Sequence, residues 1–181
     1  MNEDIKYQGR SKFTLDECQV KGKGKLEVNG TFFMKGKVEI KDQISLKIQV
    51  NPSLLISELF LNTTGSFEIV SDTPKDITFG GSFSVFNGSA SFVNVSVVIL
   101  NDFFCNSSSF RFSLSPSFNS RFYVSNNLTL DQCLFIINNS LSDWPSSIVF
   151  FEYSQVNFFF LFILIFFFKN KQNYAFNLIY I

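Results

Sequence analysis

Histidine is absent from the 181 residues. This absence removes the usual general base, the commonest metal ligand and any Ser–His or Cys–His nucleophile. The chain also lacks a phosphate-binding loop, a dinucleotide-binding fingerprint and a paired-cysteine metal spacing. Together these absences predict a protein with no catalytic, cofactor-binding or metal-binding residues.

Helix-forming residues are scarce, and the formal net charge is zero. Alanine occurs only twice, and no run places apolar residues at i, i+3, i+4 and i+7. Because basic and acidic residues balance at 15 each, no overall field favours nucleic acid. The lysines near the N-terminus alternate with acids and indicate a solvated strand face: Lys21, Lys23, Lys25, Lys35, Lys37, Lys41 and Lys47.

Phenylalanine, by contrast, occurs 26 times. Short apolar runs such as "SLKIQV" (45–50), "GSFEIV" (65–70) and "GSFSVF" (81–86) are separated by Gly, Asn, Asp, Ser or Pro, as strands are. The excess of Phe indicates aromatic stacking along the inside of a closed or two-layered sheet. The sequence therefore predicts an all-β fold.

Two patterns overlap in the N-terminal third. Asn29-Gly30 lies between two apolar runs, and this dipeptide predicts a β-hairpin. "GKLEV" (24–28), however, returns twelve residues later as "GKVEI" (36–40). A recurrence of this length fits a sandwich, a meander or the successive faces of a solenoid.

Longer repeats favour the solenoid. "FTLDECQV" (13–20) returns as "LTLDQCLF" (128–135), and "NVSVVILNDFFCNSS" (94–108) parallels "NLTLDQCLFIINNS" (127–140) at an offset of about 30 residues. With roughly 20–30 residues per coil, the 115 residues between the first pair span about four to six coils. We expect Cys18 and Cys133 at equivalent positions, and likewise Asp102 and Asp131.

These repeats predict a parallel β-solenoid, with a β-sandwich as the alternative; the right hand of the coil is what the resemblance described next implies. The expected organisation is an N-terminal segment or first coil at 1–20, solenoid repeats at 21–156 and an apolar tract with a tail at 157–181.

The segment from about 77 to 140 resembles the pectin-lyase-like parallel β-helix, with repeats of the polymorphic outer-membrane-protein type. The resemblance rests on "LTLDQCLFIINN" and "VVILNDFFCNSS", on the Phe-x-x-Asn element at 135–138, and on "FGGSF" (79–83) as a Gly-Gly-aliphatic element. It implies a right-handed coil, a dry apolar interior and a role in surface contact or anchoring.

Seven Asn-x-Ser/Thr sequons occur, against about three expected by chance from 17 Asn and 31 Ser/Thr residues. Glycosylation at these sites belongs to exposed positions of secreted proteins, although Asn- and Ser-rich corners also generate sequons. The candidate sites are Asn29, Asn62, Asn87, Asn94, Asn106, Asn127 and Asn138.

The compartment depends on the N-terminus. "MNEDIKYQGRSKF" has no apolar core and no cleavage site of a secretory signal. We therefore expect an extracellular or cell-surface protein if the N-terminus is incomplete, and a cytoplasmic one otherwise. The three cysteines, Cys18, Cys105 and Cys133, argue against a complete disulfide framework. Cys18 and Cys133 are expected to be buried in the stacked interior.

The C-terminal tract contains "FFFLFILIFFF" (158–168), eleven consecutive apolar residues followed by "KNKQN". As a helix it would span about 16 Å, which makes a short apolar helix and a marginal membrane anchor one interpretation. Residues of this segment are also those with AT-only codons, so translated flanking sequence in a gene model is the other interpretation.

The sequence favours a non-enzymatic surface or secreted β-solenoid with an adhesion or structural role, a fragment of a longer repeat protein that contacts an unidentified protein or glycan. One alternative is a cytosolic scaffold that self-associates end to end. The other is a carbohydrate-active β-helix enzyme that uses carboxylates, with Asp72, Asp76, Asp102 and Asp131 as its candidates.

Overall fold

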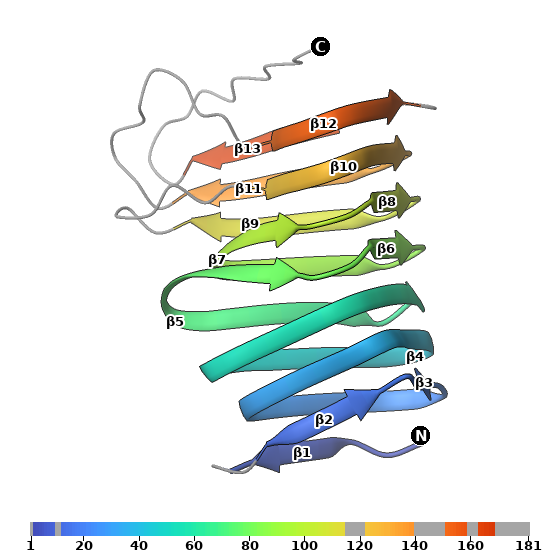
Figure 1. Cartoon of the computed structure of the whole chain (residues 1–181), viewed down its shortest axis with the longest axis vertical. Helices are drawn as coiled ribbons and strands as arrows, with labels where there is room; N and C mark the ends of the chain where they lie inside the picture. The colour runs from blue at the N-terminus through green and yellow to red at the C-terminus, as the bar shows by residue number, and fades with distance from the viewer. Residues whose placement is uncertain (1, 10–11, 115–121, 140–150, 159–162, 169–181) are drawn as a thin grey trace.

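The computed structural model describes residues 2–9, 12–114, 122–139, 151–158 and 163–168. These residues form an all-β solenoid of about six turns, in which every strand pairing is parallel. The near strands in Figure 1 run to the right and the far strands run to the left as the chain rises, so the coil is right-handed. The strands are β1 (Ile5–Gln8), β2 (Phe13–Asp16), β3 (Gln19–Val20), β4 (Lys23–Thr63), β5 (Ser66–Phe79), β6 (Phe83–Phe86), β7 (Ser89–Ile99), β8 (Phe103–Asn106), β9 (Ser109–Leu114), β10 (Phe122–Asp131), β11 (Leu134–Asn139), β12 (Phe151–Phe158) and β13 (Ile163–Phe168).

Each coil contributes to three walls. Wall 1 contains residues 46–49, 66–70, 89–93, 109–114, 134–139 and 163–168. Wall 2 contains 75–79, 95–99, 122–124 and 151–153, and wall 3 contains 59–62, 83–86, 103–106, 128–131 and 155–158. Near the N-terminus β1, β2 and β3 each pair with β4 and form the first coil. Parallel pairing satisfies the backbone of each coil on its neighbours, which excludes the antiparallel sandwich.

Inward side chains form columns that run along the solenoid axis. On wall 3 the register joins Leu59, Phe83, Phe103 and Leu128, all buried to 1% exposure or less. Wall 1 contributes similar columns, and ring centroids 4.9 Å apart join Phe110 to its register partner in β11. The aromatic stacking inside the coil is therefore confirmed between Phe67 and Phe135, whereas aliphatic side chains fill most of the interior before it, and a single coil encloses both without a second layer.

Some phenylalanines also stack on the outside, which the sequence did not indicate. Phe60, Phe86 and Phe104 lie half-buried along the outer face of wall 3, with ring centroids 5.0 Å apart at each step. The Lys37 ammonium lies 5.4 Å from the Phe60 ring centroid at one end of this row.

Corners between walls are made by residues in the left-handed region. Gly22, Asp42, Asn87, Ser107 and Gln132 all have φ between 48° and 111°, and each lies between wall 3 and wall 1 of its own coil. Backbone hydrogen bonds stack these corners on one another, for example from the Thr64 amide to the Asp42 carbonyl at 2.9 Å. Gly and Asn/Asp tolerate this conformation better than other residues. The Gly, Asn and Asp residues between the apolar runs of the sequence therefore mark corners.

The hairpin predicted at Asn29-Gly30 is wrong. Both residues lie within β4, and Gly30 has φ 150° where a Cβ would come within 2.5 Å of the Gly9 carbonyl oxygen. A close approach between coils, rather than a two-residue turn, explains the glycine. The twelve-residue recurrence joins two walls of one coil, because 26–29 pairs with β1 and 39–40 pairs with β3.

The repeated pentapeptides are not at equivalent positions. Cys18 follows β2 and begins wall 3, whereas Cys133 follows the wall 3 part of β10 and begins wall 1. What repeats is a local corner: an Asp ends a strand, the next residue is left-handed (φ 39° at Glu17 and 53° at Gln132), and a Cys follows. The offset between coils here is 25 residues, since Cys105 is the register partner of Leu130.

The predicted match of Asp102 with Asp131 is also wrong. Asp131 is the register partner of Asn106, and Asp102 precedes β8, where it lies beside Asn127. The apolar helix expected within 158–168 is wrong for residues 163–168, which form β13. The remainder of the C-terminal tract lies outside the described residues, apart from Phe158 at the end of β12. Among the residues described there is no helix whose length and apolar character would allow it to cross a membrane.

Outward charges near the N-terminus pair across and along strands, as the alternation of Lys with Glu predicts. On β4, Glu39 accepts from Lys37 at 3.0 Å and from Lys41 at 2.6 Å, and its side chain is 15% exposed. The Lys41 ammonium, followed by that of Lys37, lowers the pKa of Glu39 to about 2. Similar pairs join Lys25 to Glu27 and Lys47 to Glu68.

Phe103→Ala tests the inward column. Removing this fully buried ring leaves a cavity that the neighbouring coils cannot fill, so we expect the free energy of unfolding to fall by about 3–5 kcal/mol. Phe104→Ala is the matched control on the outer face of the same strand, and we expect a loss of about 1 kcal/mol. Urea denaturation measures both values, and equal losses would contradict the inward column.

Glu39→Gln tests the lysine pairs. Because the folded pKa of Glu39 is about 2, below its ordinary value of 4.5, this carboxylate stabilises the fold above about pH 4.5 and loses that contribution as the pH falls toward 2. The thermal midpoint of the wild type should therefore fall more steeply across that window than that of Glu39→Gln. Glu58→Gln, which removes a carboxylate without an ion pair in the described part of the chain, should keep the wild-type slope.

Candidate functional site

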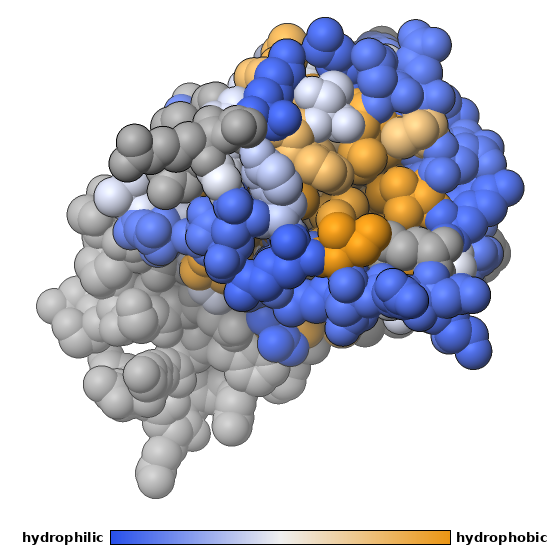
Figure 2. Space-filling model, turned by 90° about the horizontal axis from the view of Figure 1, so that it is seen from below, coloured by the Kyte–Doolittle hydropathy of each residue, from blue (hydrophilic) through white to orange (hydrophobic). Residues whose placement is uncertain are grey.

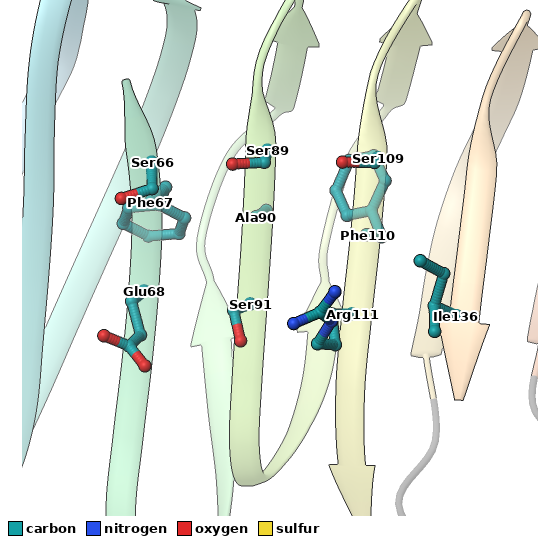
Figure 3. A pocket seen from close by; sticks show the side chains of 10 residues that line it. All are labelled: Ser66, Phe67, Glu68, Ser89, Ala90, Ser91, Ser109, Phe110, Arg111 and Ile136. Atoms are coloured by element: carbon teal, nitrogen blue, oxygen red, sulfur yellow. The ribbon is translucent and has the colours of Figure 1, made fainter. Parts of the chain in front are cut away.

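A shallow groove of about 330 Å³ lies on the outer face of wall 1. It crosses four successive strands, β5, β7, β9 and β11, and Figure 3 shows its side chains in rows that run perpendicular to them. The lining residues are Ser66, Phe67, Glu68, Ser89, Ala90, Ser91, Ser109, Phe110, Arg111 and Ile136.

One row of the groove is made of serines. Ser66, Ser89 and Ser109 are register partners, and each begins wall 1 directly after a corner. Ser45 extends the row on β4, where its Oγ accepts from the Ser66 amide at 3.1 Å. Ser66 and Ser89 are exposed, so small side chains hollow the wall here and leave a line of hydroxyls.

The second row carries opposite charges. Glu68, Ser91, Arg111 and Ile136 are register partners on successive strands. Glu68 pairs with Lys47 at 2.9 Å, whereas Arg111 is exposed and has no ion pair among the residues that the structure describes. The groove thus presents one unpaired guanidinium beside several hydroxyls.

This arrangement suits binding rather than catalysis. A serine hydroxyl needs an adjacent base to act as a nucleophile, and the nearest carboxylate, Glu68, is held by Lys47. Hydroxyls and a guanidinium fork can instead hydrogen-bond an extended ligand that carries oxygen acceptors. In the described ranges no three His, Cys, Asp or Glu side chains gather as metal ligands.

Three of the four candidate carboxylates accept hydrogen bonds within the fold, and the fourth lies exposed on a wall. Asp102 Oδ1 accepts from the amide and the side chain of Asn127, at 3.1 and 2.9 Å, and from Asn126. Asp131 Oδ2 accepts from Asn106 at 2.7 Å, while its buried Oδ1 has no hydrogen-bond partner among the described residues. Asp72 accepts from Gln49 on the previous coil at 2.9 Å, and Asp76 is exposed on wall 2. The structure brings none of these carboxylates into the groove.

The sequons differ in accessibility. Asn62 and Asn87 are exposed, and both lie at the corner that leads from wall 3 into wall 1, beside the groove. Asn94, Asn106 and Asn127 are half-buried, and each donates its side-chain amide to the chain, to Ser71 O, Asp131 and Asp102. Asn29 is half-buried on β4, and the side chain of Asn138 lies outside the described residues.

The cysteines are not all free. Cys105 and Cys133 form a disulfide between adjacent coils, which the odd count of cysteines did not indicate. Cys133 is buried as expected, at 2% exposure, and Cys105 is buried as well, whereas the burial expected for Cys18 is only partial. Cys18 is a free, half-buried thiol in the first coil, and its burial raises its pKa.

The sequence reasoning missed the groove, although a signal was present. The segments "SLKI" (45–48), "SFEI" (66–69), "SASF" (89–92) and "SFRF" (109–112) share a serine followed by an apolar, an outward and an apolar residue. Aligning them at offsets of 20–23 residues would have found the serine row.

Comparisons with protein-family models, with curated proteins and with solved structures found no match for this chain.

Cys105→Ser tests the disulfide. The bond closes a loop with a sequence separation of 28 residues, so we expect the oxidised wild type to exceed the variant by about 3–4 kcal/mol in unfolding free energy. Cys18→Ser leaves the bond intact and should keep the wild-type value.

A count of reactive thiols in denaturant without reductant measures the bond directly, with one thiol expected in the wild type. Three thiols would contradict the disulfide.

Proposed function

We propose that this chain is a secreted or surface-exposed β-solenoid with a structural or adhesive role and no enzymatic activity. The observation that carries the proposal is the buried disulfide between Cys105 and Cys133, because disulfides form and persist in oxidising compartments. It crosslinks two neighbouring coils rather than two termini, as a structural bond does.

The sequons support the same compartment. Exposed asparagines at a corner leave room for a bulky glycan without disturbing a wall or the interior. Asn62 and Asn87 meet this requirement, and the half-buried sequons hold their side-chain amides in hydrogen bonds. The resemblance to polymorphic outer-membrane-type repeats points to the same role in surface contact.

The groove on wall 1 supports an adhesive role in particular. Its hydroxyl row and the Arg111 guanidinium form a polar surface that crosses four coils and faces outward. An extended glycan or peptide on a neighbouring surface fits such a groove better than a compact small molecule. The ligand contacts then depend on outward positions, which the fold leaves free to vary.

Expression of the chain behind a cleavable secretory leader in a glycosylating host tests the compartment. We expect secretion with glycans at Asn62 and Asn87, so Asn62→Gln and Asn87→Gln should each remove one glycan mass from the intact protein. Asn106→Gln, at a half-buried sequon, should leave the mass distribution unchanged apart from the substitution. Retention of an unglycosylated, reduced chain inside the cell would contradict the proposal.

Arg111→Glu tests the groove. If wall 1 binds anionic or oxygen-rich groups, purified wild-type protein should bind intact cells or an immobilised glycan panel, and the reversed charge should weaken that binding at least tenfold. Lys23→Glu makes the same change of charge at an exposed residue outside the groove and should retain wild-type binding. Equal loss in both variants would assign the binding to net charge instead.

A further inference from the structure

Among the residues that the structure describes, no coil stacks on the end of the solenoid made by β1, β2 and β3. These three strands pair with β4 on one side only, so all three walls present a free parallel edge. Figure 2 views the molecule from this end and shows an apolar area inside a hydrophilic rim. Unpaired strand edges and uncovered apolar side chains of the interior are therefore found on the same surface.

Exposure of the inward side chains marks the same surface. Ile5 is 46% exposed, whereas its register partner Leu26 in the next coil is 3% exposed. Phe13 and Leu15 are half-buried, and their partners Phe32 and Met34 are fully buried. The first coil thus has interior residues of the same kind as the second, but without a neighbour to cover them.

We propose that the last coil of a second copy of this chain stacks on this end, head to tail. A partner must pair with three parallel edges at once and cover an apolar cross-section of the same outline. Another coil of this solenoid meets both conditions, because each coil inside the chain already stacks on the next in this way.

The two ends match wall by wall. β13 is the last described strand on wall 1 and β12 the last on walls 2 and 3, and each pairs on one side with β11 and β10. Placed below β1, β2 and β3 of another copy, they continue the parallel register without reversing the chain direction. A two-fold, head-to-head contact would instead pair the edges antiparallel, unlike the parallel strand pairings within the described chain.

The contact is heterologous, so each copy keeps one free edge and the assembly grows open-ended. This inference does not rest on the proposed function, since it depends on the strand edges at the two ends of the solenoid. Assembly would bury Cys18, which makes this thiol a reporter of the contact.

Sedimentation velocity of the 181-residue chain over about two decades of concentration, in the micromolar range, tests the proposal. We expect a ladder of species that lengthens with concentration, together with at least a tenfold fall in the rate at which a maleimide labels Cys18. Ile5→Lys, which places a charge on the exposed edge, should remain monomeric and keep its thiol reactive at every concentration.

Matched variants separate the edge from folding. Gln8→Lys places the same side chain on an exposed position of β1 whose register partner, Asn29, lies outside the core cluster, and should assemble like the wild type. Leu15→Lys and Thr14→Lys repeat the comparison on β2, where Leu15 packs against the core and Thr14 is exposed. Circular dichroism shows that each variant keeps its strand content.

Mixing distinguishes the orientation. Ile5→Lys keeps its last coil, so in a head-to-tail assembly it should cap wild-type chains and shorten them at equimolar ratio. A wild type that stops at a dimer and ignores the capping variant would overturn the head-to-tail contact in favour of a two-fold one. A wild type that stays monomeric at all concentrations would overturn self-association altogether and leave this end to a different partner.

Discussion

Parallel stacking of one coil on the next is the constraint on which the structure depends. The backbone of a wall pairs with residues about 20 to 29 positions away along the chain, so no coil is satisfied alone. In-register stacking then forces each position to keep one character along a whole column. The buried core is apolar apart from the hydroxyl residues Thr63, Ser71, Ser96 and Ser108, and most corners between walls 3 and 1 repeat the left-handed conformation.

The corner between walls 3 and 1 shows how several roles meet at one position. Its left-handed residues redirect the chain, and the serine row of the groove begins directly after it. Asn62 and Asn87 lie there with exposed side chains, and Cys133 enters the interior there to reach Cys105. Stacking makes each wall regular from coil to coil, so irregular features are found where the chain turns.

Local chemistry was read correctly from the sequence, whereas register was not. Composition and strand punctuation predicted an all-β fold, the repeats predicted the solenoid, and the Phe excess predicted the interior stack. The Asn29-Gly30 hairpin failed because a glycine allows a close approach between two coils as well as a hairpin turn. The matched pentapeptides failed for a similar reason: Asp-(Glu/Gln)-Cys encodes a turn, and a turn of that shape fits two different corners. Strands of neighbouring coils pair over long and variable sequence separations. Two similar short sequences therefore do not have to lie on the same wall.

The groove and the free end follow from opposite consequences of the same stacking. Along the walls, stacking fixes the inward columns and leaves outward ones unconstrained, so a row of serines with Arg111 can form a binding surface at no expense to the core. At the end of the solenoid the stacking stops, but the strand edges still lack pairing partners and the inward side chains still lack cover. Ile5 is therefore half-exposed, whereas its register partner in the next coil is buried. Outward residues of a wall that serve a function can be substituted one at a time, because the neighbouring columns do not depend on these side chains. A function at the end does not tolerate such substitution, because three edges and one apolar cross-section must be matched together, and that requirement is what selects another coil as the partner.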